Sequence, residues 1–457
     1  MADRILIPFE GEGSGVEELT WGQHMVWEAI LACGSSMHMS GVTQLAEGAT
    51  LEEVVAKWRF VMSRYQAIRT RLRLGADGRA LQAVASSGEI PLEIVDAGDG
   101  DPAEVAEAVR ARYEATNFDY VNEWPVRLAV VRQHGSPTHD VATLCHLVTD
   151  GVGALVLLAD VAARDPVTGQ AKAPVARMVP LELARWQRTP AMRRQSDVAL
   201  RYWEGLLRTI PPRRFRDSTD TRELPCWRAA YNSPATYKAV RLVAARSNAD
   251  FASALLAVVA VTLAQVTGSN PVVTQLLVSN RFRPGLADMV GQVAMWGLCA
   301  VDVADATLDE ALGRAWRSAM RAYKNAYYDQ RQLGELLARV GRERGGDIDL
   351  SCFFNDRRML GAEDAVRPVP TEEEVLAALP RSALRWLQPW DTAVNKLFIS
   401  VNPVPDTVDL EMWADTHYVS PADLEALLRG VEAVAVSAAL DPATPTGIRS
   451  RPAPVSA

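Results

Sequence analysis

The stretch Thr143-Leu-Cys-His-Leu-Val-Thr-Asp-Gly-Val-Gly153 carries the most information about this fold. Residues 141–146 predict a β-strand, in which Cys145 and His146 face opposite sides. Apolar residues then recur with helical spacing from position 152 to position 159. Asp150 is therefore expected in the turn between strand and helix, where its carboxylate can cap the helix or pair with an arginine. Gly151 allows that turn to be tight.

His146 is the candidate for chemistry in this stretch, since it lies where the predicted strand ends. A neutral imidazole at such a position can take a proton from an attacking amine or alcohol, or orient that nucleophile by a hydrogen bond. A hydrogen-bonded structural role is the alternative. A nucleophilic pair of Cys145 with His146 is not expected, because adjacent strand residues point to opposite sides.

Helix and strand signals alternate on both sides of this stretch. Thr50 and Glu53 have the spacing of a capping box, which predicts a helix to about Ile68. A second box, Thr307 and Glu310, precedes a predicted helix towards Tyr328. The remaining expected elements are strands at 90–95, 126–131 and 272–278 and helices at 102–116, from 249 to Gly268, and from Ser420-Pro421 onward.

This alternation predicts an α/β protein with two lobes of similar size. The expected divisions are a first lobe at 1–165, an Arg/Pro-rich connector at 166–235, a second lobe at 236–440 and a loose tail at 441–457. One helix, at about 181–207, is expected within the connector. Its arginines can attract an acidic carrier protein or a phosphate, although a solvated helix face is the commoner role of such residues.

Composition narrows the classes of function. The 457 residues carry 48 Lys and Arg against 56 Asp and Glu, a net charge of −8, which argues against a nucleic-acid binder. The five cysteines are scattered, which is typical of a reducing compartment and predicts neither disulfides nor a zinc site. No secretory leader or membrane span is predicted, so a cytoplasmic protein without a metal is expected.

Seven motifs occur in the order found in condensation domains of nonribosomal peptide synthetases, and the chain resembles this family over nearly its whole length. The family belongs to the chloramphenicol-acetyltransferase-like superfamily. The similar segments are Leu19-Thr-Trp-Gly-Gln23, Arg64-Tyr-Gln-Ala-Ile-Arg-Thr-Arg-Leu72, Asn117-Phe-Asp119 with Trp124-Pro-Val-Arg127, His146-x-x-x-Asp150-Gly151, Tyr202-Trp203, Ser279-Asn-Arg-Phe-Arg-Pro284 and Val290-Gly291.

The resemblance implies two acetyltransferase-like lobes in a V-shaped pseudo-dimer with a central tunnel. His146 matches the second, functionally important histidine of the HHxxxDG signature, and Asp150 matches its mainly structural aspartate. Arg281, with Arg283 as alternate, matches the arginine of the second lobe that pairs with this aspartate. Asn355 falls where the family sometimes has a polar channel-facing residue, and Trp296 is a candidate channel residue for an aromatic or apolar substrate.

The implied reaction is acyl transfer from a phosphopantetheine thioester to an amine or hydroxyl. Because a free-standing enzyme is expected, the expected donor is bound to a carrier protein that acts in trans. No permanently bound cofactor is expected. Cys145 replaces the first histidine of the signature, and Ala294–Ala300 lacks the asparagine and arginine of the family's "VNTLPLR" segment. Three alternatives therefore stay open: an acyl-CoA-dependent acyltransferase, a catalytically silent module that recruits a carrier domain, and an epimerisation-type domain.

Overall fold

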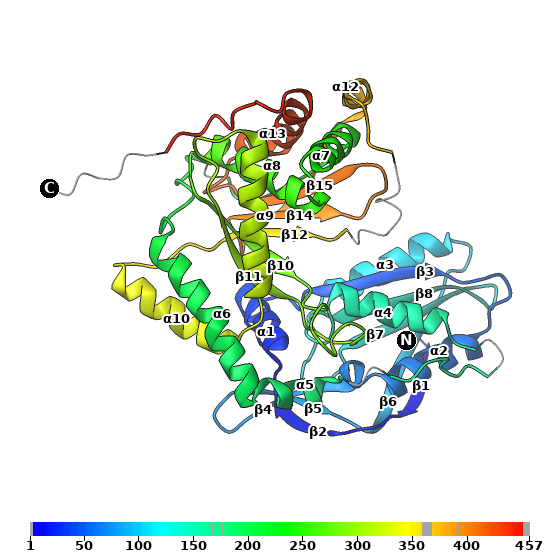
Figure 1. The fold of residues 1–457 in the computed structure, drawn as a ribbon. Coiled ribbons are helices and arrows are strands. Elements are labelled where there is room, and N and C mark those ends of the chain that lie inside the picture. The colour runs from blue at the N-terminus through cyan, green and yellow to red at the C-terminus, as the bar shows by residue number, and fades with distance from the viewer. Residues whose placement is uncertain are drawn as a thin grey trace. The chain divides into compact units, whose positions relative to one another are not determined.

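The computed structural model describes residues 3–165, 168–175, 178–220, 222–358, 368–391 and 393–450. The chain forms two compact units, and both are discontinuous in sequence (Figure 1). The first unit contains residues 1–195, the segment Ser279–Met295 and the short segment Asp329–Arg331. The second unit contains Ser196–Val278, Trp296–Tyr328 and the remainder from Gln332.

The first unit is built on a mixed five-stranded sheet. In spatial order its strands are β1 (Asp3–Glu10), β6 (Ser87–Asp96), β7 (Val126–Gln133), β8 (Ser136–Cys145) and β3 (His38–Gln44). β6 and β7 run parallel, and the other neighbours run antiparallel. A separate three-stranded sheet consists of β2 (Gly15–Glu18), β5 (Ala80–Val84) and β4 (Thr70–Leu74).

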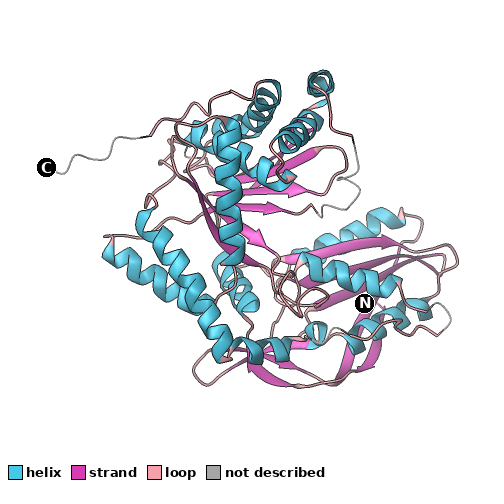
Figure 2. Ribbon diagram, in the orientation of Figure 1, coloured by secondary structure: helices cyan, strands magenta, loops and turns pink. Residues whose placement is uncertain are grey.

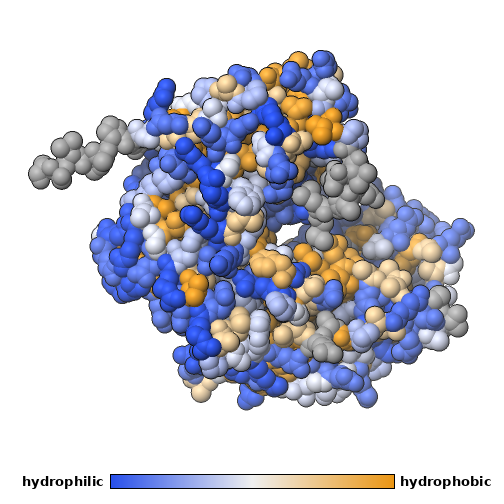
Figure 3. Space-filling view, in the orientation of Figure 1, coloured by the Kyte–Doolittle hydropathy of each residue, from blue (hydrophilic) through white to orange (hydrophobic). Residues whose placement is uncertain are grey.

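Helices accompany these sheets (Figure 2). They are α1 (Trp21–Cys33), α2 (Leu51–Arg64), α3 (Pro102–Glu114), α4 (Gly151–Ala162) and α5 (Pro180–Gln187). Ala106 and Val109 of α3 pack on Val131 and Val141 of β7 and β8, which buries one face of the sheet. α4 differs, since Leu155 and Leu158 are 49% and 59% exposed, and Figure 3 shows apolar residues gathered over this helix.

The second unit contains a seven-stranded sheet. Its order is β11 (Met295–Val301), β10 (Val272–Val278), β12 (Cys352–Asp356), β14 (Leu397–Asn402), β15 (Val408–Asp415), β9 (Cys226–Ser233) and β13 (Ala383–Trp390). The helices of this unit are α7 (Pro234–Arg246), α8 (Phe251–Thr267), α9 (Leu308–Lys324), α12 (Glu372–Ala378) and α13 (Pro421–Leu440), together with most of α6 (Pro190–Thr209) and of α10 (Gln330–Glu343).

The core of the second unit lies between this sheet and α7, α8, α9 and α13. α8 is buried at every residue from Ser253 to Ala264, so this helix is packed on all its faces and not on one face only. Asp250 caps its start, and Gly268 ends it in the left-handed conformation at φ 66°. Among the described residues no single helix is long and apolar enough to cross a membrane, although α7 and α8, bent by 113° at their junction, pass together on length and composition.

Most predicted elements lie where the sequence placed them, but β8 begins five residues before the predicted strand at 141–146, and three helix boundaries were wrong. The helix expected at 181–207 is two helices, because Pro190 lacks an N–H and begins α6 as a new helix after α5 ends at Gln187. α2 ends at Arg64 rather than near Ile68, and a 3₁₀ turn, η1 (Gln66–Arg69), follows an extended residue. α9 ends at Lys324, four residues before the predicted end.

Candidate active site

His146 is the first residue after β8, and its side chain is half-buried. Its Nδ1 lies 3.2 Å from Oε1 of Gln292, a residue of the first unit that is 146 positions away in the sequence. The amide of Gln292 is itself oriented, because its Nε2 donates to the carbonyl of Ala294 at 3.1 Å. Its Oε1 therefore faces the imidazole as an acceptor.

This contact determines which imidazole nitrogen is available for chemistry. Because an amide oxygen can only accept, Nδ1 of His146 carries the proton that is donated to Gln292. The neutral ring then has its lone pair on Nε2, the nitrogen that can take a proton from another molecule. Gln292 is buried at 3% exposure, so this orientation is held by groups shielded from water.

Asp150 fixes the loop that follows His146. Its Oδ1 accepts from the backbone N–H of Gly153 at 2.8 Å, which caps α4, and from Nη2 of Arg281 at 2.6 Å. Its Oδ2 accepts from the backbone N–H groups of Val293 and Ala294, both at 3.0 Å. This carboxylate therefore joins the start of α4 to the segment that also carries Gln292.

Arg281 completes the same network. The ion pair with Asp150 is buried, with side-chain exposures of 8% and 4%. Nη1 of Arg281 also donates to the carbonyls of Leu286 and Met289, at 3.2 and 2.6 Å. The guanidinium thus holds the loop from Arg281 to Met289 together while it binds the carboxylate of Asp150. Although Ser279–Met295 lies between two strands of the second unit, it clusters with the first unit, so this pair lies within one unit.

The crowded glycine of this loop is Gly153 rather than Gly151. A Cβ added at Gly153 would lie 2.4 Å from Oγ1 of Thr149, 3.0 Å from Nη2 of Arg281 and 3.1 Å from the carbonyl of Gly291. At Gly151 a Cβ would meet nothing within 4 Å, and the backbone there is not left-handed. The tight turn expected from Gly151 therefore does not depend on that glycine.

Cys145 points away from His146 into the interior. It is buried, it pairs with His38 in the β3–β8 ladder, and its Sγ donates to the carbonyl of Ser36 at 3.6 Å. Burial raises the pKa of the Cys145 thiol to about 12. A thiol that stays protonated at neutral pH is not a nucleophile, so this cysteine packs the strand end.

Trp296 and Asn355 lie in the second unit. Trp296 begins a row of half-buried rings on neighbouring strands, with centroids 4.8 Å apart from Trp296 to Phe353, 5.7 Å from Phe353 to Phe398 and 4.1 Å from Phe398 to Trp413. Their strand neighbours, such as Phe354 and Ile399, belong to the core under the helices. By alternation the rings and Asn355 face the other side of the sheet.

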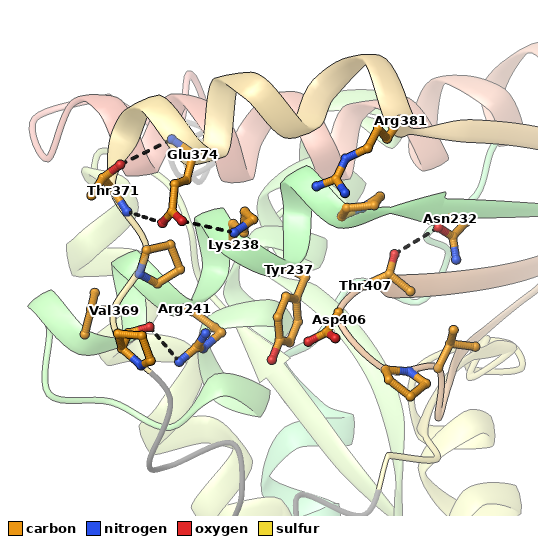
Figure 4. A pocket seen from close by; sticks show the side chains of 15 residues that line it. Asn232, Tyr237, Lys238, Arg241, Val369, Thr371, Glu374, Arg381, Asp406 and Thr407 are labelled. Carbon is orange, nitrogen blue, oxygen red and sulfur yellow. Dashed lines mark hydrogen bonds and ion pairs between the residues drawn. The ribbon is translucent and has the colours of Figure 1, made fainter.

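A cavity of about 810 Å³ lies elsewhere in the second unit, at the margin of α7 and α12 (Figure 4). Two of its basic side chains are bonded within the wall: Lys238 pairs with Glu374 at 3.7 Å, and Arg241 donates to the carbonyl of Pro368. It contains none of the predicted site residues. Among the described ranges, no group of three or more His, Cys, Asp or Glu side chains can hold a metal ion.

The family model of the condensation domain matches residues 18–358. The chain belongs to the condensation-domain family. This family works in nonribosomal peptide synthesis, and the matched region includes the loop that contains His146, Asp150 and Gly151. The mixed α/β architecture described above is the chloramphenicol-acetyltransferase-like fold of these domains.

Curated relatives are multidomain synthetases. The chain is 23% identical over 291 residues to the nonribosomal peptide synthetase kk1B of Curvularia clavata, covering 61% of the chain and 2% of the synthetase. It is 27% identical over 299 residues to the phosphinothricin tripeptide synthetase PhsC of Streptomyces viridochromogenes, covering 62% of the chain and 27% of the synthetase. The matched region is thus a small part of each relative.

Solved structures share the fold. The X-domain from teicoplanin biosynthesis superposes with a TM-score of 0.72 at 17% identity, covering 97% of this chain and 99% of that chain. The condensation domain of the enacyloxin polyketide synthase, described as mediating chain release, gives a TM-score of 0.70 at 19% identity. The superposition covers 93% of this chain and 83% of that chain. Domains described in different ways thus share this architecture.

Gln292 is the site residue that the sequence analysis missed. It follows Val290-Gly291, a motif that was noted for its resemblance, but an isolated glutamine gives no signal of its function. The one signal is its place directly after a recognised motif whose neighbours bind Asp150.

Proposed function

We propose that this chain catalyses condensation, with His146 as its catalytic residue. An acyl or aminoacyl group would pass from a phosphopantetheine thioester, on a carrier protein or on CoA, to an amine or hydroxyl acceptor. The observation that carries the proposal is the hydrogen bond from Nδ1 of His146 to Gln292, which leaves Nε2 free to act as a base. The names of the relatives support a place in the biosynthesis of peptide antibiotics or related metabolites.

The proposed step balances without a further reactant. The acceptor nitrogen or oxygen forms a bond to the thioester carbonyl carbon, and its proton passes to Nε2 of His146. The C–S bond breaks, and the thiolate leaves with the proton returned by the imidazolium. The products are an amide or ester and a free phosphopantetheine thiol. Gln292 acts as a positioning residue, since its acceptor also stabilises the imidazolium formed during the step.

Thiol release tests this function directly. A panel of acyl-phosphopantetheine and acyl-CoA thioesters is offered with amine and alcohol acceptors, and the products are identified by mass. Release that depends on the acceptor and falls by about 10² to 10⁴ in His146→Ala supports the proposal. Folding of the variant is checked by circular dichroism, and His139→Ala, a histidine of β8 outside the site, serves as control.

The second candidate is a silent recruitment module that binds a carrier domain. Two observations favour it: Cys145 stands in place of the first histidine of the signature, and the similar X-domain has been solved in complex with OxyB. A folded wild type that binds loaded carrier protein, yet releases no thiol with any donor or acceptor, would replace the catalytic proposal with this one.

A further inference from the structure

In the second unit Arg214 is a buried charge that lies near the carboxylate of Asp349. It is only 6% exposed, and Nε, Nη1 and Nη2 have no hydrogen-bond partner among the residues that the structure describes. The guanidinium remains charged in proteins. A buried guanidinium whose donors make no hydrogen bond is strongly unfavourable even beside an anion, so a group not belonging to the chain is expected to satisfy these donors.

Asp349 is the carboxylate that acts electrostatically on Arg214. The backbone N–H of Asp349 donates to the carbonyl of Pro212 at 2.9 Å, which brings the Asp349 segment beside Arg214. The Asp349 carboxylate is shared with a second cation: its Oδ2 lies 3.3 Å from Nζ of Lys396 without accepting a hydrogen bond within the described chain, and its Oδ1 accepts from the N–H of Ser351. Arg214 and Lys396 together carry two positive charges against the single negative charge of Asp349.

Further polar capacity remains open in this part of the unit. Lys396 is 19% exposed and lies over the ring of Tyr418 at 3.8 Å, so it connects the buried group with solvent. Thr416, near Lys396 at the end of β15, is buried and its hydroxyl has no partner within the described chain. The carbonyl of Lys396 accepts from the N–H of Asp415, which ties these two segments together.

We infer that Arg214 is the anchor of an internal site for a small monocarboxylate, with Lys396 as its second cation. A carboxylate matches the planar fork of a guanidinium and can accept two parallel hydrogen bonds. One negative charge brings Arg214, Lys396 and Asp349 to neutrality, whereas a phosphate dianion would leave an excess of negative charge beside Asp349. This site shares no residue with the proposed catalytic loop.

The neighbouring arginine provides a matched control. Arg213 carries the same charge one residue earlier, but it is 68% exposed and pairs with Asp217 at 3.1 Å. A salt effect on the protein surface would act through both arginines. Binding at the internal site would depend on Arg214 alone.

Thermal unfolding of the full chain at fixed ionic strength tests the site, with acetate as the probe and with chloride and inorganic phosphate as comparison anions. We expect a saturable rise of the melting temperature with acetate in the wild type and in Arg213→Met. In Arg214→Met, the apparent acetate affinity should fall by about tenfold or more. Hydrogen exchange locates the effect, since acetate should slow exchange at 211–218 and 349–352.

Several results would overturn the inference. An absent or non-saturating response in the wild type would mean that water hydrates Arg214. An equal response in the two arginine variants would assign the effect to general salt. Tighter saturation by phosphate than by acetate would contradict the monocarboxylate. If Arg214→Met does not fold, Lys396→Met takes its place, and unchanged acetate saturation in that variant would exclude the proposed pair of cations.

Discussion

Replacing Asp150 by alanine should loosen the loop of the candidate site far more than the loss of a helix cap alone. The carboxylate accepts four hydrogen bonds, from Arg281 and from the backbone of Gly153, Val293 and Ala294, at 2.6 to 3.0 Å. Removing one partner of a buried ion pair costs about 3–5 kcal/mol, whereas removing an N-cap costs about 1 kcal/mol. We therefore expect a local loss of at least about 3 kcal/mol.

Hydrogen exchange measures this loss where it occurs. A cost of about 3 kcal/mol corresponds to exchange faster by about two orders of magnitude at the amides of Gly153, Val293 and Ala294. Peptides that cover 150–154 and 291–295 report these amides by mass spectrometry. The midpoint of urea unfolding should fall in parallel, since the network joins segments far apart in the sequence.

Asp101→Ala is the matched control, because Asp101 also caps a helix. Its carboxylate accepts from the N–H of Ala103 at 2.9 Å, but at an exposed position and without an ion pair to any residue that the structure describes. This variant should lose only the cap. If Asp150→Ala and Asp101→Ala show the same small change, the buried pair contributes nothing beyond capping, and the reasoning is refuted.

Three further predictions concern the same loop. Gln292→Leu should lower the rate of thiol release by about tenfold and change its pH profile, because Nδ1 of His146 loses its acceptor; a fall without a change in the profile would indicate a purely structural role. Gly153→Ala should lower the melting temperature, while Gly151→Ala should leave it equal or higher, since only the first added Cβ meets Thr149; equal losses would contradict the geometry. The free energy of unfolding should fall as the pH rises from about 9 to about 12, because burial raises the pKa of Cys145 and the folded state holds the proton that the unfolded state releases. Cys145→Ala should flatten that alkaline decline in urea unfolding, and an unchanged slope would count against a buried, protonated thiol.

Much of the fold was predictable because its signals are local. The boxes at Thr50 and Thr307 and the cap at Ser420 use side chains that bond within their own helix, and each helix begins where these residues indicate. β10 occupies Val272–Val278 as predicted. The connector helix was predicted as one element because its apolar spacing continues across Pro190, where the backbone cannot continue.

The site was predictable only in part, because its decisive contacts are distant in the sequence. His146 and Asp150 belong to a recognisable motif, and the motif at Ser279–Pro284 supplied Arg281. Gln292 has no such mark, and its function depends on two hydrogen bonds that only the folded chain reveals. The crowding of Gly153 is likewise invisible in the sequence, since it arises from Thr149, Arg281 and Gly291 meeting at one point.

The discontinuous first unit has a consequence for synthesis on the ribosome. Asp150 leaves the ribosome well before three of its four partners, which follow 131, 143 and 144 residues later. At translation rates of about 5–20 residues per second, the carboxylate waits for about 7 to 30 seconds before its network can form. During this interval the start of α4, with its exposed leucines, lacks the strongest of its anchors. Chaperones are expected to bind the nascent chain during this interval. A fragment that ends at residue 195 would lack the segment Ser279–Met295, so it would need chaperones permanently.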